Sequence, residues 1–241
     1  MNYSKNELSE NLKQIHEKIR EAEKRAGRQA DSVRLLAVSK FHPLQSVLDA
    51  YNAGQTLFGE NRVQEARNKF ESINLSCPDI LLHLIGTLQR NKVKDAVKIA
   101  DCIESVDRIE LLEDIEKQCT KYNRTIKILF EFHTGEESKS GFLSYESLEE
   151  AVAFCSDGKT PHIIPSGFMT MAPFTDDKNA VHSAFSLMRT TAEKLKTAYP
   201  QLPLSELSMG MSGDFEIAIE EGSTIVRIGT AIFGERDYTA T

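Results

Sequence analysis

A lysine and a glycine-threonine pair each follow an apolar run in this chain, and their chemistry is complementary. Lys40 comes after the run 33–38, and Gly229 and Thr230 come after the run 225–228. Desolvation beside an apolar strand favours the neutral lysine amine, which forms a Schiff base with an aldehyde. Successive backbone N–H groups with a nearby hydroxyl bind a phosphate. An aldehyde cofactor that carries a phosphate uses both groups, so these residues together predict a pyridoxal-phosphate site.

Two further residues suit this chemistry. Ser208 opens the small-residue stretch 208–214, which follows another candidate strand and would extend the phosphate site. Arg227 lies inside the last apolar run, and an arginine that faces a barrel interior needs an acceptor. A cofactor ring nitrogen would serve, and the arginine would leave that nitrogen unprotonated, which makes the ring a poor electron sink. A salt bridge to a carboxylate is the alternative for this arginine.

The same positions also have interpretations that need no cofactor. A lysine at a strand end extends its amine to water, and small residues after a strand form tight turns. Asn61 either lines the cofactor ring or caps the helix that follows it, and capping is the commoner role. His83 and His133 are acid or base candidates at strand ends, although the sequence has no metal-binding spacing such as H-E-x-x-H.

Short apolar runs typical of strands alternate along the chain with amphipathic segments typical of helices. Residues 1–30 are predicted to hold an extra N-terminal helix, with a capping box at Ser4 and Glu7 and a C-cap at Gly27. The stretch 157–173 is broken by proline and glycine and is expected to hold only a short strand and a loop. The eight candidate strands are Val33–Val38, Thr56–Phe58, Leu81–Ile85, Cys102–Val106, Ile126–Phe132, His162–Ile164, Leu204–Leu207 and Ile225–Ile228. The helices between them are Pro43–Ala53, Arg62–Ile73, Arg90–Ala100, Arg108–Lys121, Tyr145–Phe154, Asn179–Ala198 and Asp214–Glu221.

Repeated strand and helix units predict an α/β fold, a single (β/α)8 TIM barrel. We expect one domain, 1–241, with the helix of residues 1–30 packed on the barrel, and an open doubly wound sheet is the alternative. Functional side chains of such barrels lie at the carboxyl ends of the strands. Lys40, Asn61 and Thr230 fall at such positions.

Composition and charge narrow the functional classes. The 241 residues carry a net charge of -7, so nucleic acid is not expected as the main partner. Four scattered cysteines without a C-x-x-C pair, a polar N-terminus and the absence of a long apolar run predict a reduced cytoplasmic protein without a membrane span. The sequence has no Walker loop, no G-x-G-x-x-G and no Ser-His-Asp order, which removes support for nucleotide enzymes and hydrolases.

Seven ordered blocks, spread over nearly the whole chain, resemble one family. They are AVSK at 37–40, FGENRVQE at 58–65, HLIGTLQRNK at 83–92, ESKSG at 137–141, GFMTM at 167–171, LSMGMS at 207–212 and VRIGTAIFG at 226–234. On these blocks the chain resembles the pyridoxal-phosphate homeostasis protein family, also called the proline synthetase co-transcribed homologues. The resemblance implies a barrel like the N-terminal domain of alanine racemase.

The resemblance also implies roles for individual residues. Lys40 would carry the internal aldimine, and Arg227 would face the pyridine nitrogen. The phosphate would be held by Ser208, Gly229 and Thr230. Asn61 would lie beside the ring. The family usually has asparagine where this chain has His133, a departure that affects the hydrogen bonding expected at the fifth strand.

The function implied by the resemblance is that of a pyridoxal 5'-phosphate carrier or regulator that affects amino-acid and keto-acid metabolism. The implied partners are the cofactor and pyridoxal-phosphate-dependent apo-enzymes, and we expect a monomer. Catalytic relatives take a second acid or base group from an additional β-domain and a partner subunit. We expect no such domain after the eighth strand of this chain, and therefore an open site and no established turnover. A small fold III racemase or lyase is the alternative, and a cofactor-free interaction scaffold is a third.

Overall fold

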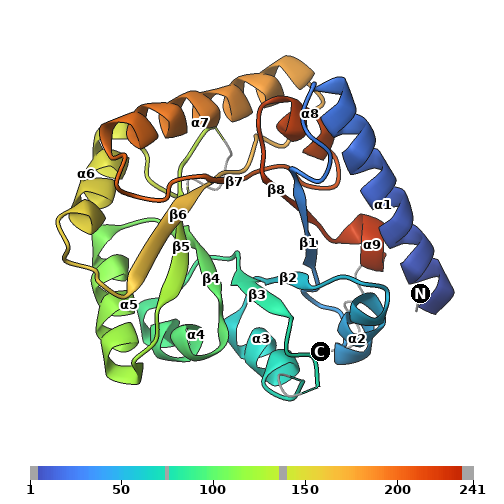
Figure 1. Ribbon diagram of the computed structural model, residues 1–241, viewed down its shortest axis with the longest axis horizontal. Helices are drawn as coiled ribbons and strands as arrows, with labels where there is room; N and C mark the ends of the chain where they lie inside the picture. The colour runs from blue at the N-terminus through green and yellow to red at the C-terminus, as the bar shows by residue number, and fades with distance from the viewer. Residues whose placement is uncertain (1–4, 74–75, 136–139, 235–241) are drawn as a thin grey trace.

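Eight parallel strands, β1 to β8, form a closed barrel in sequence order. The computed structural model describes residues 5–73, 76–135 and 140–234. Helices surround the strands on the outside of the barrel (Figure 1). Because β1 pairs with β8, the sheet has no open edge in the barrel wall. The predicted (β/α)8 TIM barrel is therefore confirmed, and the open doubly wound sheet is excluded.

The strands and helices alternate along the chain as the apolar pattern predicts. The strands are β1 Arg34–Val38, β2 Leu57–Glu60, β3 Leu81–Leu84, β4 Cys102–Val106, β5 Ile126–Glu131, β6 Ile163–Met169, β7 Glu206–Ser208 and β8 Ile225–Ile228. The helices are α1 Lys5–Arg25, α2 Leu44–Asn52, α3 Val63–Phe70, the 3-10 turn η1 Arg90–Lys92, α4 Val93–Ile99, α5 Ile109–Tyr122, α6 Tyr145–Ser156, α7 Lys178–Ala198, α8 Phe215–Glu220 and α9 Thr230–Phe233.

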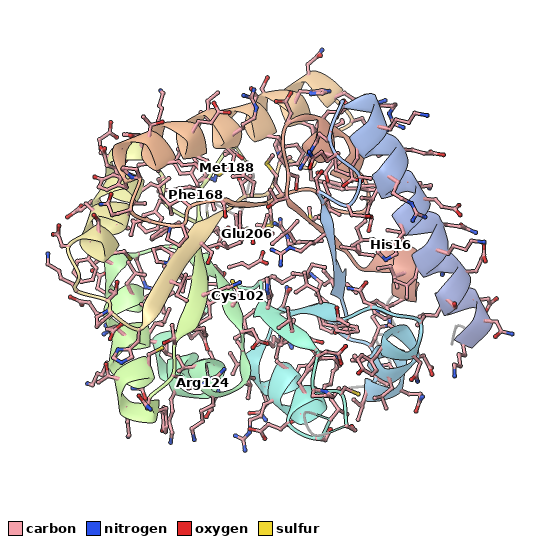
Figure 2. The ribbon with its side chains drawn as sticks, in the orientation of Figure 1. His16, Cys102, Arg124, Phe168, Met188 and Glu206 are labelled. Carbon is pink, nitrogen blue, oxygen red and sulfur yellow. The ribbon has the colours of Figure 1, made fainter. Side chains whose placement is uncertain are left out.

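Side chains of each strand alternate between the helix layer and the barrel interior, as the two-residue period of a strand requires. In β1, Leu35 joins the large core between strands and helices, whereas Leu36 packs with Ile225 inside the barrel. Figure 2 shows Phe168 and Met188 filling the space between β6 and α7. Each strand therefore has only a few residues whose side chains point into the barrel. A charged side chain at such a position lies in the centre of the molecule.

The extra N-terminal helix, α1, packs against α8, α9 and α2 on the outside of the barrel (Figure 1). Its apolar face is buried. The backbone leaves the helix at Gly27, whose φ is +66°, and the Arg28 N–H donates to the Glu23 carbonyl at 2.8 Å. This geometry is typical of a glycine C-cap and confirms that prediction. Ser4 of the predicted capping box lies outside the described residues.

Strand β6 extends further than the sequence predicts. It runs over Ile163–Met169, whereas His162–Ile164 followed by a loop was expected, and that boundary was wrong. The pairing of β5 with β6 shifts between Pro165 and Gly167, so a bulge absorbs the residues that break a regular strand. Gly167 has φ +152°, and a Cβ there would lie 2.0 Å from the Glu206 carbonyl oxygen, so only glycine fits.

Two other elements differ from expectation. Strand β7 covers Glu206–Ser208 rather than Leu204–Leu207, because Leu204 packs in the outer core before the strand begins. The four-residue helix α9, Thr230–Phe233, was not predicted and begins directly after Gly229. Among the described residues, no helix combines the length and apolar character that a bilayer span needs.

Candidate cofactor site

The predicted site residues lie at the carboxyl ends of four neighbouring strands. Lys40 is two residues past the end of β1, Asn61 directly follows β2, and Ser208 is the last residue of β7. Gly229 directly follows β8, and Thr230 is the first residue of α9. Since β7, β8, β1 and β2 are consecutive around the closed barrel, these residues share one sector of its mouth.

The peptide around the predicted lysine is held from both sides by side chains of β2 and α3. The Ser39 hydroxyl donates to Glu60 Oε1 at 2.7 Å, and the Ser39 carbonyl accepts from Lys69 Nζ at 2.8 Å. The Phe41 N–H donates to Glu65 Oε1 at 2.6 Å. Lys69 Nζ lies 2.9 Å from Glu60 Oε1 and 2.7 Å from Glu65 Oε1. One ammonium and two carboxylates therefore fix both neighbours of Lys40.

We call Glu60, Glu65 and Lys69 the lysine-loop clamp. The Glu60 side chain is fully buried and Lys69 is nearly so, since β2 directs Glu60 outward against α3. Burial raises the pKa of the Glu60 carboxyl, and the charge and hydrogen bond of Lys69 oppose that rise. Phe41 adopts φ +67°, a left-handed conformation that a bulky residue keeps only when its surroundings enforce it. The clamp supplies such a contact through the Phe41 N–H.

Gly229 brings the end of β8 close to the end of β1. A Cβ built on Gly229 would lie 3.0 Å from the Val38 carbonyl oxygen and 3.3 Å from the Val38 Cβ. The register that pairs Ala37 with Ile228 causes this approach. Thr230 is exposed at the start of α9. The glycine-threonine turn and the lysine loop are therefore adjacent, as a ligand bound by both requires.

Arg227 points into the barrel, which decides between the two orientations that the sequence allows. Its Nη1 donates to the Ser208 carbonyl at 2.6 Å and to Ser208 Oγ at 2.9 Å, and its Nη2 donates to the Thr170 carbonyl at 2.8 Å. A guanidinium has five N–H donors. Two of them make no hydrogen bond with the described residues, so the side chain keeps capacity for one further acceptor.

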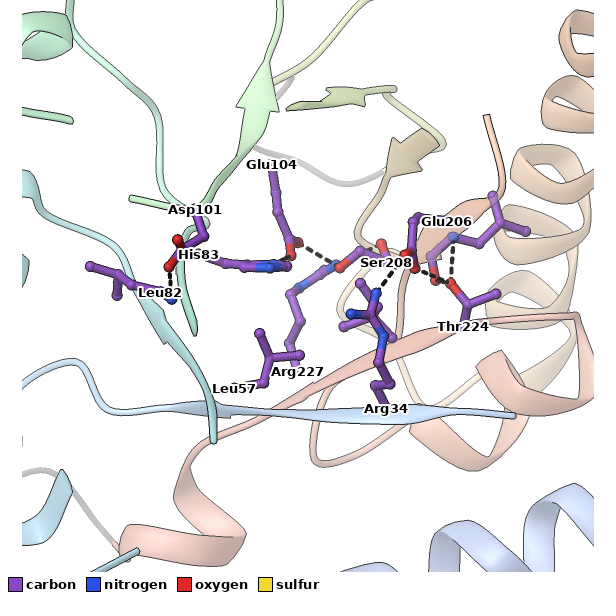
Figure 3. Close-up of polar contacts among 12 residues, drawn as sticks. Arg34, Leu57, Leu82, His83, Asp101, Glu104, Glu206, Ser208, Thr224 and Arg227 are labelled. Atoms are coloured by element: carbon purple, nitrogen blue, oxygen red, sulfur yellow. Dashed lines mark hydrogen bonds and ion pairs between the residues drawn. The ribbon is translucent and has the colours of Figure 1, made fainter. Parts of the chain in front are cut away.

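A buried carboxylate, Glu104, compensates Arg227 and connects it to other interior groups. Glu104 Oε1 lies 2.6 Å from His83 Nδ1, and Glu104 Oε2 accepts from Ser208 Oγ at 2.6 Å. Figure 3 shows these side chains side by side across the barrel interior. Burial raises the pKa of the Glu104 carboxyl, but His83, Arg227 and Ser208 together outweigh burial and lower it. Burial lowers the pKa of the Arg227 guanidinium, and the charge of Glu104 opposes that change.

The hydrogen bonds of Ser208 bear on its predicted phosphate role. Its hydroxyl donates to Glu104 and accepts from Arg227, and the residue is buried. A phosphate contact through this hydroxyl would have to replace the bond to Glu104. In the structure Ser208 holds the arginine, and the phosphate contacts of Ser208, Gly229 and Thr230 stay predictions.

Two predicted residues lie at the edge of this arrangement. Asn61 is held against the chain that follows β3, since a Cβ on Gly86 would lie 2.5 Å from the Asn61 carbonyl oxygen. It directly precedes Arg62, the N-cap residue of α3, so it is not itself the cap. His133 follows β5 and is half-buried, and its N–H donates to the Phe142 carbonyl at 3.0 Å. The Glu136–Lys139 part of the predicted charged loop lies outside the described residues.

Sequence reasoning missed Glu104, Glu60 and Lys69 as members of the site. Glu104 had the same signal as Arg227, namely a charge inside an apolar strand, and the period of β4 places it inward beside Cys102. Lys69 follows Glu65 by four residues, a spacing that predicts an ion pair on a helix but not its contact with the chain around Lys40.

The sector thus combines three kinds of group. The loop that carries Lys40 lies beside the turn at Gly229, and a buried, permanently charged guanidinium with two donors that bond no described residue lies in the barrel interior. The amine, the turn and the guanidinium are chemically complementary to an aldehyde, a phosphate and a ring nitrogen, respectively, and one small molecule can carry all three. The residues present therefore fit pyridoxal phosphate.

Known proteins are similar to this chain in sequence and in fold. Residues 11–237 match the family model described as alanine racemase, N-terminal domain. The pyridoxal phosphate homeostasis protein of Aquifex aeolicus is 40% identical over 229 residues, which cover 95% of this chain and 98% of that protein. The protein of the same name from Mus musculus is 38% identical over 95% of this chain and 86% of its own length.

Solved structures agree with these matches. PipY of Synechococcus elongatus, in a structure with PLP bound, superimposes with a TM-score of 0.82 at 35% identity, covering 94% of this chain and 100% of PipY. An alanine racemase of Clostridium difficile has a TM-score of 0.75 at 13% identity, covering 97% of this chain and 57% of the racemase, and it shows a shared fold. The sequence matches and the barrel agree, and this chain belongs to the pyridoxal phosphate homeostasis protein family.

Proposed function

We propose that this chain binds pyridoxal 5'-phosphate at the mouth sector formed by β7, β8, β1 and β2, and takes part in the homeostasis of that cofactor. The observation that carries the proposal is the contact between the segment that precedes Lys40 and the segment that contains Gly229 and Thr230. Gly229 packs on Val38, two residues before Lys40, which supports a site shared by the lysine loop and the predicted phosphate turn. The relatives described above, including PipY with PLP bound, support the same ligand.

Each residue has a role that follows from its position. Lys40 supplies the amine, and the lysine-loop clamp holds its two neighbours. Gly229 and Thr230 donate to the phosphate, and Asn61 lies at the ring side. Arg227 offers its remaining donors to the ring nitrogen while Ser208 and Glu104 hold the guanidinium in place. When bound, the cofactor supplies an aldehyde that condenses with an amine and a ring that withdraws electrons.

We further propose that the chain buffers or delivers the cofactor rather than catalysing a reaction. A guanidinium facing the ring nitrogen donates a hydrogen bond but does not transfer a proton, so electron withdrawal by the ring stays weak. The imidazole of His83, a candidate acid or base, is bound to Glu104 in the barrel interior. Curated relatives carry the name of a homeostasis protein. Delivery to apo-enzymes, a monomeric state, one domain spanning 1–241 and a cytoplasmic location belong to the same proposal.

A small fold III racemase or lyase is the second candidate, and the barrel shared with alanine racemases favours it. Adding pyridoxal phosphate to the cofactor-free protein tests the first proposal, because a visible absorbance band should appear and should be absent in Lys40→Ala. Steady-state assays over D- and L-amino acids then separate the two candidates. Turnover well above that of free cofactor would overturn the non-catalytic role.

A further inference from the structure

A pocket opens at the carboxyl ends of β2 and β3, beside the cofactor sector. It encloses about 390 Å³, within the range of small-ligand sites. The buried side chains of Leu84, Leu88 and Val63 form its apolar part, and Arg62 and Lys92 contribute its charge. Most of the lining comes from residues 84–92, to which the cofactor site assigns no ligand contact.

The charges of this pocket are all of one sign. None of the ten described residues that line it is acidic, although the chain has 36 acidic residues and a net charge of -7. Arg62 stacks on the Phe41 ring with its Cζ 5.7 Å from the ring centroid and, in the described part of the chain, forms no ion pair. The ammonium of Lys92 likewise pairs with no described carboxylate.

Nearby carboxylates are already engaged elsewhere. Glu60 and Glu65 bind Lys69 in the lysine-loop clamp. Asp114 binds Arg90, the cation two residues before the pocket lysine, through two hydrogen bonds. The two pocket cations are thus left for an external anion.

We propose that this pocket binds a small organic carboxylate. A guanidinium pairs with a carboxylate through two parallel hydrogen bonds, and an ammonium adds a second charged donor. The amides of Gln64 and Gln89 and the hydroxyl of Thr87 supply neutral polar contacts. The apolar wall suits a carbon skeleton, which an inorganic anion lacks. A short dicarboxylate combines these features.

The pocket and the cofactor sector have Asn61 in common. A carboxylate held by Arg62 and Lys92 would therefore lie beside Asn61 without using the predicted phosphate turn. The inference does not rest on the proposed function, because the pocket is formed by the protein alone.

Calorimetric titration of the full chain with succinate tests the inference, with inorganic phosphate as the second probe. Arg62→Met and Lys92→Met should each weaken succinate binding at least tenfold, the effect of losing the charge-assisted hydrogen bonding of one cation. Lys94→Met is the matched control, an exposed lysine two residues past Lys92, in the first turn of α4, that is not among the lining residues, and it should leave the affinity unchanged. Pyridoxal-phosphate affinity, measured by absorbance, should stay the same in all three variants.

Each other outcome has a definite meaning. No succinate binding at millimolar concentration, or an equal loss in Lys94→Met, overturns the inference. Binding of phosphate without binding of succinate replaces the carboxylate with an inorganic or ester phosphate and also overturns it. Loss of pyridoxal-phosphate binding in Arg62→Met and Lys92→Met would assign the pocket to the cofactor. Succinate binding in a protein that fails to bind pyridoxal phosphate supports the inference and refutes only the proposed function.

Discussion

Replacing Lys69 with methionine should disturb the chain around Lys40 and destabilise the fold. The substitution removes the ammonium that bonds the Ser39 carbonyl, Glu60 and Glu65, and leaves a buried carboxylate without its cation. Breaking a buried ion pair by removing one partner costs roughly 3–5 kcal/mol. We expect the lower end, about 3 kcal/mol, because Glu65 is 22% exposed and keeps contact with water.

The pH dependence of this loss has a defined sign. In Lys69→Met the pKa of Glu60, already raised by burial, should rise further because the opposing charge is gone. The penalty is then small below the ordinary value of 4.5 and grows as the pH rises through the folded-state pKa. Urea unfolding at several pH values measures it, and absorbance measures cofactor uptake by the remaining folded protein.

A double variant separates the clamp from a general packing defect. Adding Glu60→Gln to Lys69→Met removes the unpaired charge, so the double variant should be more stable than the single variant at neutral pH. Cofactor uptake should stay impaired in both, since the Ser39 carbonyl lacks its donor. Unchanged stability and unchanged uptake in Lys69→Met would refute the role of the clamp.

Four further substitutions test the mouth and interior of the barrel. Gly229→Val should weaken cofactor binding and destabilise the fold by roughly 1–3 kcal/mol, because even a Cβ would lie 3.0 Å from the Val38 carbonyl oxygen. Thr230→Val should weaken cofactor binding by about 1–3 kcal/mol without changing the stability of the fold. If titrations show that both variants bind the cofactor as tightly as the unmodified protein, the phosphate lies elsewhere. Arg227→Glu should shift the visible spectrum of the bound cofactor and its pH dependence, and a fully protonated ring nitrogen in nitrogen-15 spectra of the unmodified protein would contradict the role of the arginine. Glu104→Gln should destabilise the protein at neutral pH. The difference in unfolding free energy from the unmodified protein should shrink as the pH falls below 4.5, because a carboxyl whose pKa is lowered by folding loses its stabilising effect as it becomes protonated. A difference that stays constant with pH in urea unfolding would exclude an ionised Glu104.

The barrel was predictable because each strand is a short apolar run followed by an amphipathic segment. These local patterns correspond to the strands and helices of the folded protein. Strand β6 differed most from the prediction, since its bulge uses Pro165 and Gly167 to fit against β5 and β7, a tertiary constraint that local propensity does not contain. Helix α9 escaped prediction because four residues are too few to show a helical period.

The candidate site was predictable to the extent that its residues lie at strand ends. Lys40, Gly229 and Thr230 could be placed from the chain alone, because a barrel gathers such ends. The partners of Arg227 could not, since Ser208 and Glu104 reach it from different strands across the interior. Contacts between side chains from different strands across the barrel interior have no fixed sequence spacing, so the sequence alone does not predict them.

Borohydride reduction of the protein loaded with pyridoxal phosphate, followed by peptide mapping, tests the central assignment most directly. Reduction makes the bond between cofactor and amine permanent, so the modified peptide identifies the lysine. The cofactor should be found on Lys40, and Lys40→Ala should yield no modified peptide. An adduct on Lys92 or Lys139 in the unmodified protein would contradict the site described above.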